Sequence, residues 1–275
     1  MSMRVGRIGY INCFPVYGAI DHGIVEIPGE LVTGTPSELN ELLAAGELGV
    51  SVISAVEYAR DSDLYTLLPD LAISSDGPVR SVKLFSRKPV EQLENATILI
   101  SQSSRTSVLL LELLLKEVCG VNVFMVSARA EAVDLGLLGK LPHDGVLVIG
   151  DAALHLDIAD RYDYSYDLGT EWKRWTGLPF VFAVWAGRRN VDQAQVSAIH
   201  RGLLASRDWG LQNIDTLAAD ASRVSGFDVA MCREYLSGLD YALSPKHIEG
   251  LSTFFNRLES NGSIPSGSLT FLSVA

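Results

Sequence analysis

The chain has 275 residues, of which 48% are hydrophobic and 20% charged, a composition typical of a globular protein with a sizeable core. Its net charge of −11 makes nucleic acid and anionic membrane surfaces poor partners, although a small anion can still bind where hydrogen-bond donors are concentrated. Cys13, Cys119 and Cys232 follow no disulfide or zinc spacing, so we expect a reducing, cytoplasmic location.

The N-terminal region reads MSMRVGRIGYINCFPVYG and has no apolar signal-peptide core, and the most apolar window, 107–115, is too short to span a bilayer. Residues 4–11 predict a first strand, and Pro15 favours a helix over 16–21. Asn12 therefore follows the carboxyl end of a strand, where ligands of α/β sheets commonly bind. Asn is equally common in tight turns, so ligand contact and local turn chemistry both stay open for Asn12.

Strands and helices continue to alternate through the first part of the chain. Strands are expected at 31–34, 49–54, 64–68 and 71–74, and helices at 37–45 and 55–59. Pro69 and Asp70 separate the last two of these strands. Residues 79–86 alternate apolar and polar side chains and predict another strand, which carries Ser81. We interpret 86–89, which follows it, as a crossing into a second lobe.

The stretch from Ala96 to Val118 has the most distinctive pattern of the sequence. Apolar residues 98–100 predict a buried strand, and the apolar run after residue 107 predicts a buried helix. Between them lies a cluster of hydroxyl groups with one guanidinium, formed by Ser103, Ser104, Arg105, Thr106 and Ser107. Unpaired N–H groups converge at a helix start, so this cluster favours a site for a carboxylate or phosphate. The alternative is a simple N-cap, which needs only one hydroxyl.

The rest of the chain repeats the alternation and ends in helices. Strands are expected at 122–127, 145–149 and 179–186, and helices at 130–138, 192–212, 215–225, 228–237 and 245–260. We interpret the strand at 179–186, with residue 187, as the return crossing into the first lobe. Gly150 and Asp151 follow the strand at 145–149. Asp151 either accepts a hydrogen bond from a substrate or caps the next helix, and capping is the more common role. Trp172 and Trp175 predict core packing in a short amphipathic helix.

This order of elements predicts an α/β protein with two lobes and two crossings, arranged as a clamshell with the ligand between the lobes. We expect residues 1–86 and 187–275 to form the first lobe, with the C-terminal helices packed on it, and residues 87–186 to form the second. Asn12, Ser81, the hydroxyl cluster and Asp151 all fall at strand ends or crossings, which favours each of them as part of one site.

Motifs spread along the chain resemble, in order, those of the chorismate dehydratases of the futalosine route to menaquinone. They are GRIGYINCFPVY, DGPVRSVKLFS, SSRTSVLLLELLL, VLVIGDAAL and DLGTEWKRWTGLPFVFAVWAGRR, and they cover most of the chain up to residue 190. The resemblance implies a periplasmic-binding-protein-like type II fold and a cytoplasmic lyase that converts chorismate into 3-[(1-carboxyvinyl)oxy]benzoate and water. By motif, it implies catalytic roles for Asn12 and Ser81, and substrate contacts for Ser104, Thr106 and Ser107.

The implied chemistry depends on hydrogen-bond donors. Removal of the C3 proton of chorismate places negative charge in the ring carboxylate, and loss of the C4 hydroxyl makes the ring aromatic. Hydroxyl and N–H groups at a helix start can donate hydrogen bonds to the two carboxylates. These hydrogen bonds can become stronger as the negative charge develops. The five histidines lie outside the matched motifs. We therefore predict that the side-chain carboxylate of the substrate takes the proton, while Asn12 and Ser81 hold it in reach.

Neither a cofactor fingerprint nor a metal-binding triad occurs in the sequence, so no cofactor and no metal are expected.

Two other functions fit the predicted fold: a non-catalytic binding protein for a small carboxylate, and 1,4-dihydroxy-6-naphthoate synthase, which uses a histidine near its substrate. A ligand-sensing regulatory domain would normally accompany a DNA-binding segment, and none is evident. The sequence does not determine the oligomeric state, and a homodimer is compatible with it.

Overall fold

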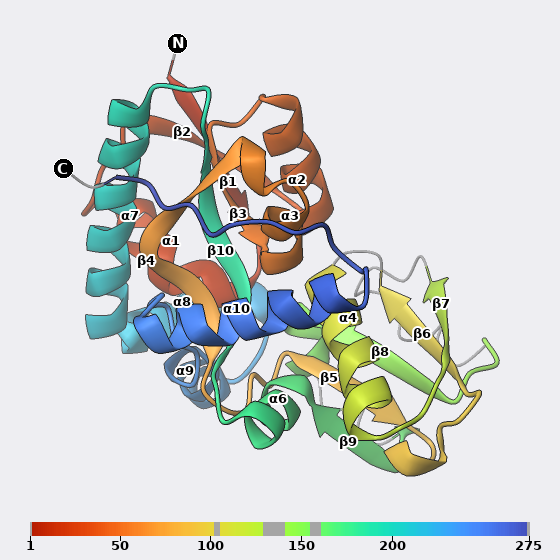
Figure 1. The fold of residues 1–275 in the computed structure, drawn as a ribbon. Coiled ribbons are helices and arrows are strands. Elements are labelled where there is room, and N and C mark those ends of the chain that lie inside the picture. The colour runs from red at the N-terminus through yellow and green to blue at the C-terminus, as the bar shows by residue number, and fades with distance from the viewer. Residues whose placement is uncertain (1, 102–104, 129–140, 155–160, 274–275) are drawn as a thin grey trace. The chain divides into compact units, whose positions relative to one another are not determined.

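The computed structural model of the protein describes residues 2–101, 105–128, 141–154 and 161–273 (Figure 1). Its backbone contacts divide the chain into two compact units. Unit 1 comprises Met1–Ser74 and Val181–Ala275, and unit 2 comprises Ser75–Phe180. The chain therefore passes twice between two α/β units, as the sequence predicted.

The first crossing lies earlier in the chain than we expected, and the second lies at the start of the expected segment 179–187. The first was expected at 86–89, but residues 82–86 form a strand that is paired on both sides inside the sheet of unit 2. The sequence assigned residues up to 186 to the second lobe, but 180–188 pair inside the sheet of unit 1. The division differs because strand pairing, which the sequence pattern does not reveal, decides the unit to which a segment belongs.

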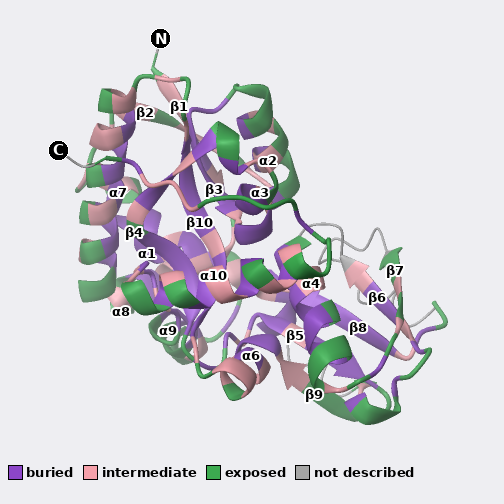
Figure 2. Ribbon diagram, viewed as in Figure 1, coloured by how far each residue is buried: buried purple, intermediate pink, exposed green. Residues whose placement is uncertain are grey.

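The sheet of unit 1 has five strands in the order β2-β1-β3-β10-β4. Their bounds are Met3–Ile8 (β1), Gly29–Gly34 (β2), Val50–Ser54 (β3), Tyr65–Ser75 (β4) and Phe180–Arg188 (β10). β1 pairs in parallel with β2 and β3, whereas β10 pairs antiparallel with β3. β3 and β10 are mostly buried, as central strands covered on both faces should be (Figure 2).

Helices cover both faces of this sheet. They are α1 (Phe14–Asp21), α2 (Pro36–Ala45), α3 (Ala55–Arg60), α7 (Gln193–Gln212), α8 (Ile214–Ser225), α9 (Val229–Ser237) and α10 (Pro245–Ser260). The chain moves from β1 outward to β2 and then back past β1 to β3, so right-handed connections place α1 and α2 on opposite faces. Figure 1 shows α2 and α3 on one side of the sheet and α7 on the other.

Strand β4 runs unbroken through Pro69 and Asp70, where the sequence predicted two separate strands. Asp70 has a left-handed φ of 53°, so the backbone is distorted at this point. Two buried side chains of α7 contact the distortion: His200 Nε2 lies 2.7 Å from the Pro69 carbonyl oxygen, and Arg207 donates to the Asp70 carbonyl oxygen. The strand continues past the proline because a neighbouring helix satisfies these carbonyl groups.

The sheet of unit 2 has five strands in the order β7-β6-β8-β5-β9. Their bounds are Val82–Ser86 (β5), Thr97–Ser101 (β6), Phe124–Ala128 (β7), Gly145–Ile149 (β8) and Tyr164–Asp167 (β9). β6 pairs in parallel with β7 and β8, and β5 pairs antiparallel with β8 and β9. The sequence did not predict β9, because this edge strand is short, polar and partly exposed.

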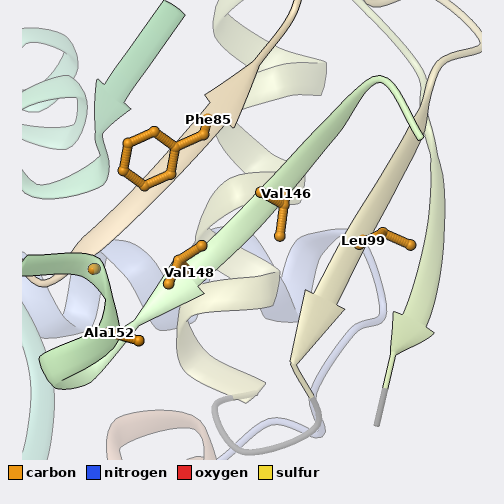
Figure 3. Packing of buried hydrophobic residues seen from close by; sticks show 6 residues of the cluster. Phe85, Leu99, Val146, Val148 and Ala152 are labelled. Carbon is orange, nitrogen blue, oxygen red and sulfur yellow. The ribbon is translucent and has the colours of Figure 1, made fainter. Parts of the chain in front are cut away.

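The core of unit 2 is centred on its inner strands. Buried side chains of β5, β6 and β8 form a cluster, which Figure 3 shows around Phe85, Leu99, Val146 and Val148. Phe85 and Leu99 each lie opposite Val146 in the pairing register, so the three side chains share one face of the sheet.

Helices α4 and α6 also belong to unit 2. α4 spans Arg105–Leu113 and continues as a π-helical turn over Leu114–Val118, while α6 spans Leu168–Thr176. Within α6, the fully buried Trp172 meets the partly buried Trp175 edge-on with ring centroids 5.7 Å apart, so Trp172 packs in the core as predicted and Trp175 lies at its margin. The helix predicted at 130–138 lies outside the described residues.

We expect the contact between α1 and α7 to tolerate no side chain at Gly210. A Cβ atom on Gly210 would lie 2.2 Å from the carbonyl oxygen of Pro15, so Gly210→Ala must displace the start of α1. The expected loss in the free energy of unfolding is about 1–3 kcal/mol, measured by urea denaturation. The exposed neighbour Leu211 provides the control, because Leu211→Ala should change stability by no more than about 0.5 kcal/mol. Equal stability of the two variants would contradict this packing.

Candidate functional site

Unit 2 gathers polar groups at one edge of its sheet. β6 and β8 run parallel, so the segments that follow them, the start of α4 and Gly150-Asp151, leave from the same edge. β5 runs antiparallel to β8, so Ser81, which precedes it, lies at that edge as well. The Gly150 N–H donates to the Ser81 carbonyl oxygen at 2.8 Å. The structure therefore brings Ser81, Gly150 and Asp151 together within unit 2.

The predicted hydroxyl cluster is described in part. Ser103 and Ser104 lie outside the described residues, and Arg105 is the exposed first residue of α4. Thr106 and Ser107, in the first turn of α4, are only 1% and 2% exposed. A helix start concentrates N–H groups and the positive end of the helix dipole, so it stabilises an anion. The first turn of α4 can thus offer backbone and hydroxyl donors to one carboxylate.

Gly150 and Asp151 form a turn directly after β8. Gly150 has a left-handed φ of 66°, a conformation that favours glycine, and it opens a 3-10 turn over Gly150–Leu154. Ala152 and Ala153 are buried in the core cluster of unit 2 and fasten this turn to the sheet. Asp151 is partly exposed at the start of the turn, a position that suits either of the roles considered for it.

Ser81 itself is 3% exposed and follows an unusual turn. Its N–H donates to the Val79 carbonyl oxygen at 2.8 Å, and Arg80, between the two, has a φ of 64°. The carboxylate of Asp167 contacts this turn, and Asp167 was not among the residues predicted for the site. Asp167 precedes Leu-Gly-Thr, which is a readable helix-cap signal for α6, but its reach to Val79 and Arg80 depends on tertiary structure.

In unit 1, Asn12 lies in a short 3-10 helix, Ile11–Cys13, between the end of β1 and the start of α1. Its Oδ1 atom is buried and meets no hydrogen-bond donor among the described residues. A buried amide oxygen without a donor costs free energy, so this atom is a candidate for ligand contact. That observation favours ligand contact over simple turn chemistry.

Tyr17 fixes the helix that begins beside Asn12. Its hydroxyl donates to the Gly6 carbonyl oxygen at 3.0 Å and accepts from Trp185 Nε1 at 2.9 Å, so α1 is tied to β1 and β10. Burial raises the pKa of the Tyr17 phenol far above its usual value, so the group stays neutral. The hydrogen bonds of Tyr17 therefore hold the carboxyl end of β1 and the start of α1 in one arrangement.

The described histidines are all engaged in local contacts. His22 contacts Asp220; His143 contacts the Leu141 carbonyl and the Tyr162 hydroxyl; His200 contacts the Pro69 carbonyl; and His247 contacts Ser244 and Asp240. His143 precedes β8, so it lies at the edge of the sheet opposite to Gly150. Burial lowers the pKa of His200. His155 lies outside the described residues.

Within the described ranges, no helix is both long and apolar enough to cross a bilayer. In the same ranges, no three His, Cys, Asp or Glu side chains gather as the ligands of a metal ion would.

Comparison with protein families and curated proteins gives one consistent result. A family model described as "Menaquinone biosynthesis" matches residues 3–260. The chorismate dehydratase of Thermus thermophilus is 33% identical over 270 residues, which cover 92% of this chain and 94% of that protein. The similarity therefore extends over both units.

Solved structures agree on the fold. A crystal structure of an Archaeoglobus fulgidus protein superposes with a TM-score of 0.79 at 21% identity, covering 95% of this chain and 98% of that one. A Candida albicans protein described as having the generic periplasmic binding protein structural fold superposes with a TM-score of 0.66 at 12% identity, covering 100% and 98% of the two chains. The predicted periplasmic-binding-protein-like fold is confirmed.

Proposed function

We propose that this chain, which belongs to the family described as menaquinone biosynthesis, is a chorismate dehydratase. The observation that carries the proposal is the 33% identity to the Thermus thermophilus chorismate dehydratase, which extends over 92% of this chain. The reaction is a lyase reaction: chorismate loses the C3 proton and the C4 hydroxyl as water and becomes 3-[(1-carboxyvinyl)oxy]benzoate. The substrate is a dicarboxylate, so the site must offer donors to two carboxylate groups.

The first turn of α4 is proposed to bind one of these carboxylates. Thr106 and Ser107 place two hydroxyls at a helix start, where backbone N–H groups and the helix dipole already favour negative charge. As the C3 proton leaves, charge develops in the ring carboxylate, and donors fixed around it stabilise the transition state more than the ground state. Thr106 and Ser107 are buried, so water would compete little with a ligand that reached their hydroxyls.

The base is proposed to be the side-chain carboxylate of the substrate. The described histidines are engaged in local contacts, and His143 lies at the edge of its sheet opposite to Gly150. Asn12 belongs to unit 1, and Ser81 is buried beside Gly150 in unit 2. The Asn12 amide N–H₂ and the Ser81 hydroxyl are hydrogen-bond donors, and each is proposed to help keep the substrate carboxylate near the C3 proton, which makes the transfer intramolecular.

The proposal is tested first by incubating the purified protein with chorismate. We expect the chorismate absorbance to fall and a product lighter by one water to appear in the mass spectrum. If the protein binds chorismate without converting it, it is a non-catalytic binding protein. If it leaves chorismate unchanged and turns over the naphthoate precursor, it is the related naphthoate-forming enzyme.

Replacing Thr106 and Ser107 together by Ala should reduce kcat/KM, through a strongly raised KM and a lower kcat. Each lost hydrogen bond to a charged group is worth roughly 1.5–3 kcal/mol, so we expect a loss of at least about 100-fold for the pair. Steady-state kinetics with chorismate measure it. Ser206→Ala is the matched control, because Ser206 is a buried serine on helix α7. Wild-type kcat/KM in the double variant would mean that the hydroxyls only cap α4.

Substitution of Asn12 should separate charge from positioning. Asn12→Asp places a like charge beside a carboxylate and removes an amide donor, so we expect the larger loss of turnover. Asn12→Ala should mainly reduce kcat, because the substrate carboxylate is then held less well. Both rates are compared at equal occupancy of the enzyme by chorismate. If Asn12→Asp is as active as the wild type, Asn12 does not contact the substrate.

The pH dependence of turnover tests the absence of a histidine base. We expect kcat to show no enzyme group that titrates near the ordinary histidine pKa of about 6.5. Single His→Ala substitutions at the five histidines should leave kcat largely intact. Unfolding temperatures of the same variants identify any that fail through misfolding. A folded His→Ala variant that binds chorismate but does not convert it would disprove substrate-assisted proton removal.

A further inference from the structure

Asp167, the last residue of β9, accepts hydrogen bonds from the backbone of two separate segments. Its Oδ1 accepts hydrogen bonds from the N–H groups of Thr170 and Val79, each at 3.0 Å, and its Oδ2 accepts from the N–H of Arg80 at 2.6 Å. The Thr170 contact is the ordinary N-cap of α6. The contacts to Val79 and Arg80 are not needed for a cap, and they connect Asp167 to a segment far away in the sequence.

The segment that Asp167 contacts is strained. Arg80 has a φ of 64°, and the Ser81 N–H donates to the carbonyl oxygen of Val79, two residues earlier, at 2.8 Å. A turn closed by this hydrogen bond around a residue with positive φ is a rare form of γ-turn. For a residue with a side chain, such a conformation persists only where the surroundings hold it, and it occurs preferentially at functional sites.

The start of α6 packs directly on the same segment. A Cβ atom on Gly169 would lie 2.4 Å from the Gly77 carbonyl oxygen and 2.6 Å from Ser75 Oγ, so only glycine permits this approach. Lys173 of α6 also pairs with Asp76. The first turn of α6 and residues 75–80 therefore form one packed piece, and Asp167 lies at its centre.

Both backbone polar groups of Ser81, its N–H and its carbonyl oxygen, form hydrogen bonds. Its N–H is bonded within the γ-turn that Asp167 contacts, and its carbonyl oxygen accepts from the Gly150 N–H at 2.8 Å. The Ser81 hydroxyl also donates to the Val79 carbonyl oxygen, at 3.4 Å, so the position of the Ser81 side chain depends on the conformation of the turn at Arg80. Arg80 in turn depends on the carboxylate that accepts its N–H.

We propose that Asp167 is a positioning residue for the dehydration of chorismate: its carboxylate holds the Val79-Arg80-Ser81 turn in the conformation that presents Ser81 to the substrate. This inference rests on the proposed function. Asp167 acts through Ser81 and takes no part in the chemistry itself. The competing interpretation is that Asp167 only caps α6, in which case its loss would affect stability alone.

Asp167→Asn distinguishes these two roles. The Asn side chain keeps one oxygen, which can still cap α6 and accept from Val79, but it turns an N–H₂ group toward the N–H of Arg80. We expect an unfolding temperature near that of the wild type and a fall in kcat of about 10- to 100-fold, because the reacting groups are misplaced. Asp167→Ser also caps α6 but is too short to reach Arg80, so it should show the same loss.

Asp192 provides the matched control. It caps α7 in unit 1 through the N–H groups of Ala194 and Gln195, at 2.9 and 3.3 Å. Asp192→Asn therefore makes the same chemical change at a helix cap outside the proposed site. It should leave both kcat and KM at their wild-type values. An equal loss of turnover in the Asp192 and Asp167 variants would overturn the positioning role.

A double-mutant cycle with Ser81→Ala measures the coupling between the two residues in turnover. A purely structural role of Asp167 would give no such coupling. If Asp167 acts through Ser81, Asp167→Asn should cost little further turnover once the Ser81 hydroxyl is gone. Where Ser81→Ala leaves too little turnover, the same cycle is measured on the affinity for 3-[(1-carboxyvinyl)oxy]benzoate by calorimetry. Full additivity of the two substitutions would overturn the proposal.

Turnover of the wild-type protein shows whether the inference about Asp167 or the proposed function itself is wrong. If the wild-type protein converts chorismate and Asp167→Asn does so equally well, only the inference about Asp167 is wrong. If the wild-type protein does not convert chorismate, the proposed function is wrong, and the role assigned to Asp167 is wrong with it.

Discussion

The antiparallel pairing of β5 with β8 is the constraint on which the candidate site of unit 2 depends. β6 and β8 are parallel and deliver α4 and Gly150-Asp151 to one edge of the sheet. A third parallel strand in the position of β5 would begin at the opposite edge. Because β5 is antiparallel, the segment before it begins where β8 ends, and the Gly150 N–H reaches the Ser81 carbonyl. Unit 1 repeats the arrangement with β10 antiparallel to β3.

The donors of this site are mostly neutral groups. The chain carries a net charge of −11, so a dicarboxylate gains nothing from the overall field of the protein. In the proposed site, hydroxyl groups and N–H groups at the start of α4 would supply the favourable interaction locally, where burial makes each hydrogen bond stronger than it would be in water. Fixed neutral donors of this kind suit a reaction whose charge moves within the substrate, because they need not reorganise as the proton leaves.

Side chains from distant segments hold the backbone in uncommon conformations at two places in the fold. Asp167 contacts the turn at Arg80, and residues of α7 contact the distorted strand at Pro69 and Asp70. In each case a side chain from a segment far away in the sequence forms hydrogen bonds with backbone groups that have no partner in the local structure. Strain near Ser81 is then a property of the assembled unit and not of residues 79–81 alone.

The sequence by itself determined most of the element order, with β9 and the continuity of β4 as exceptions, because apolar periodicity, proline and helix caps act locally. The strand at 145–149 and the helix at 245–260 lie where the pattern predicted them. The sequence also predicted that the hydroxyls of Thr106 and Ser107 lie at a helix start and that Asn12 lies between a strand and a helix. Both positions follow from neighbouring residues in the chain. Tertiary structure alone decided the rest: whether 82–86 pairs in unit 2, how β4 passes Pro69, and which carboxylate holds the turn before Ser81. These are contacts between segments distant in sequence, and local propensity carries no information about their partners.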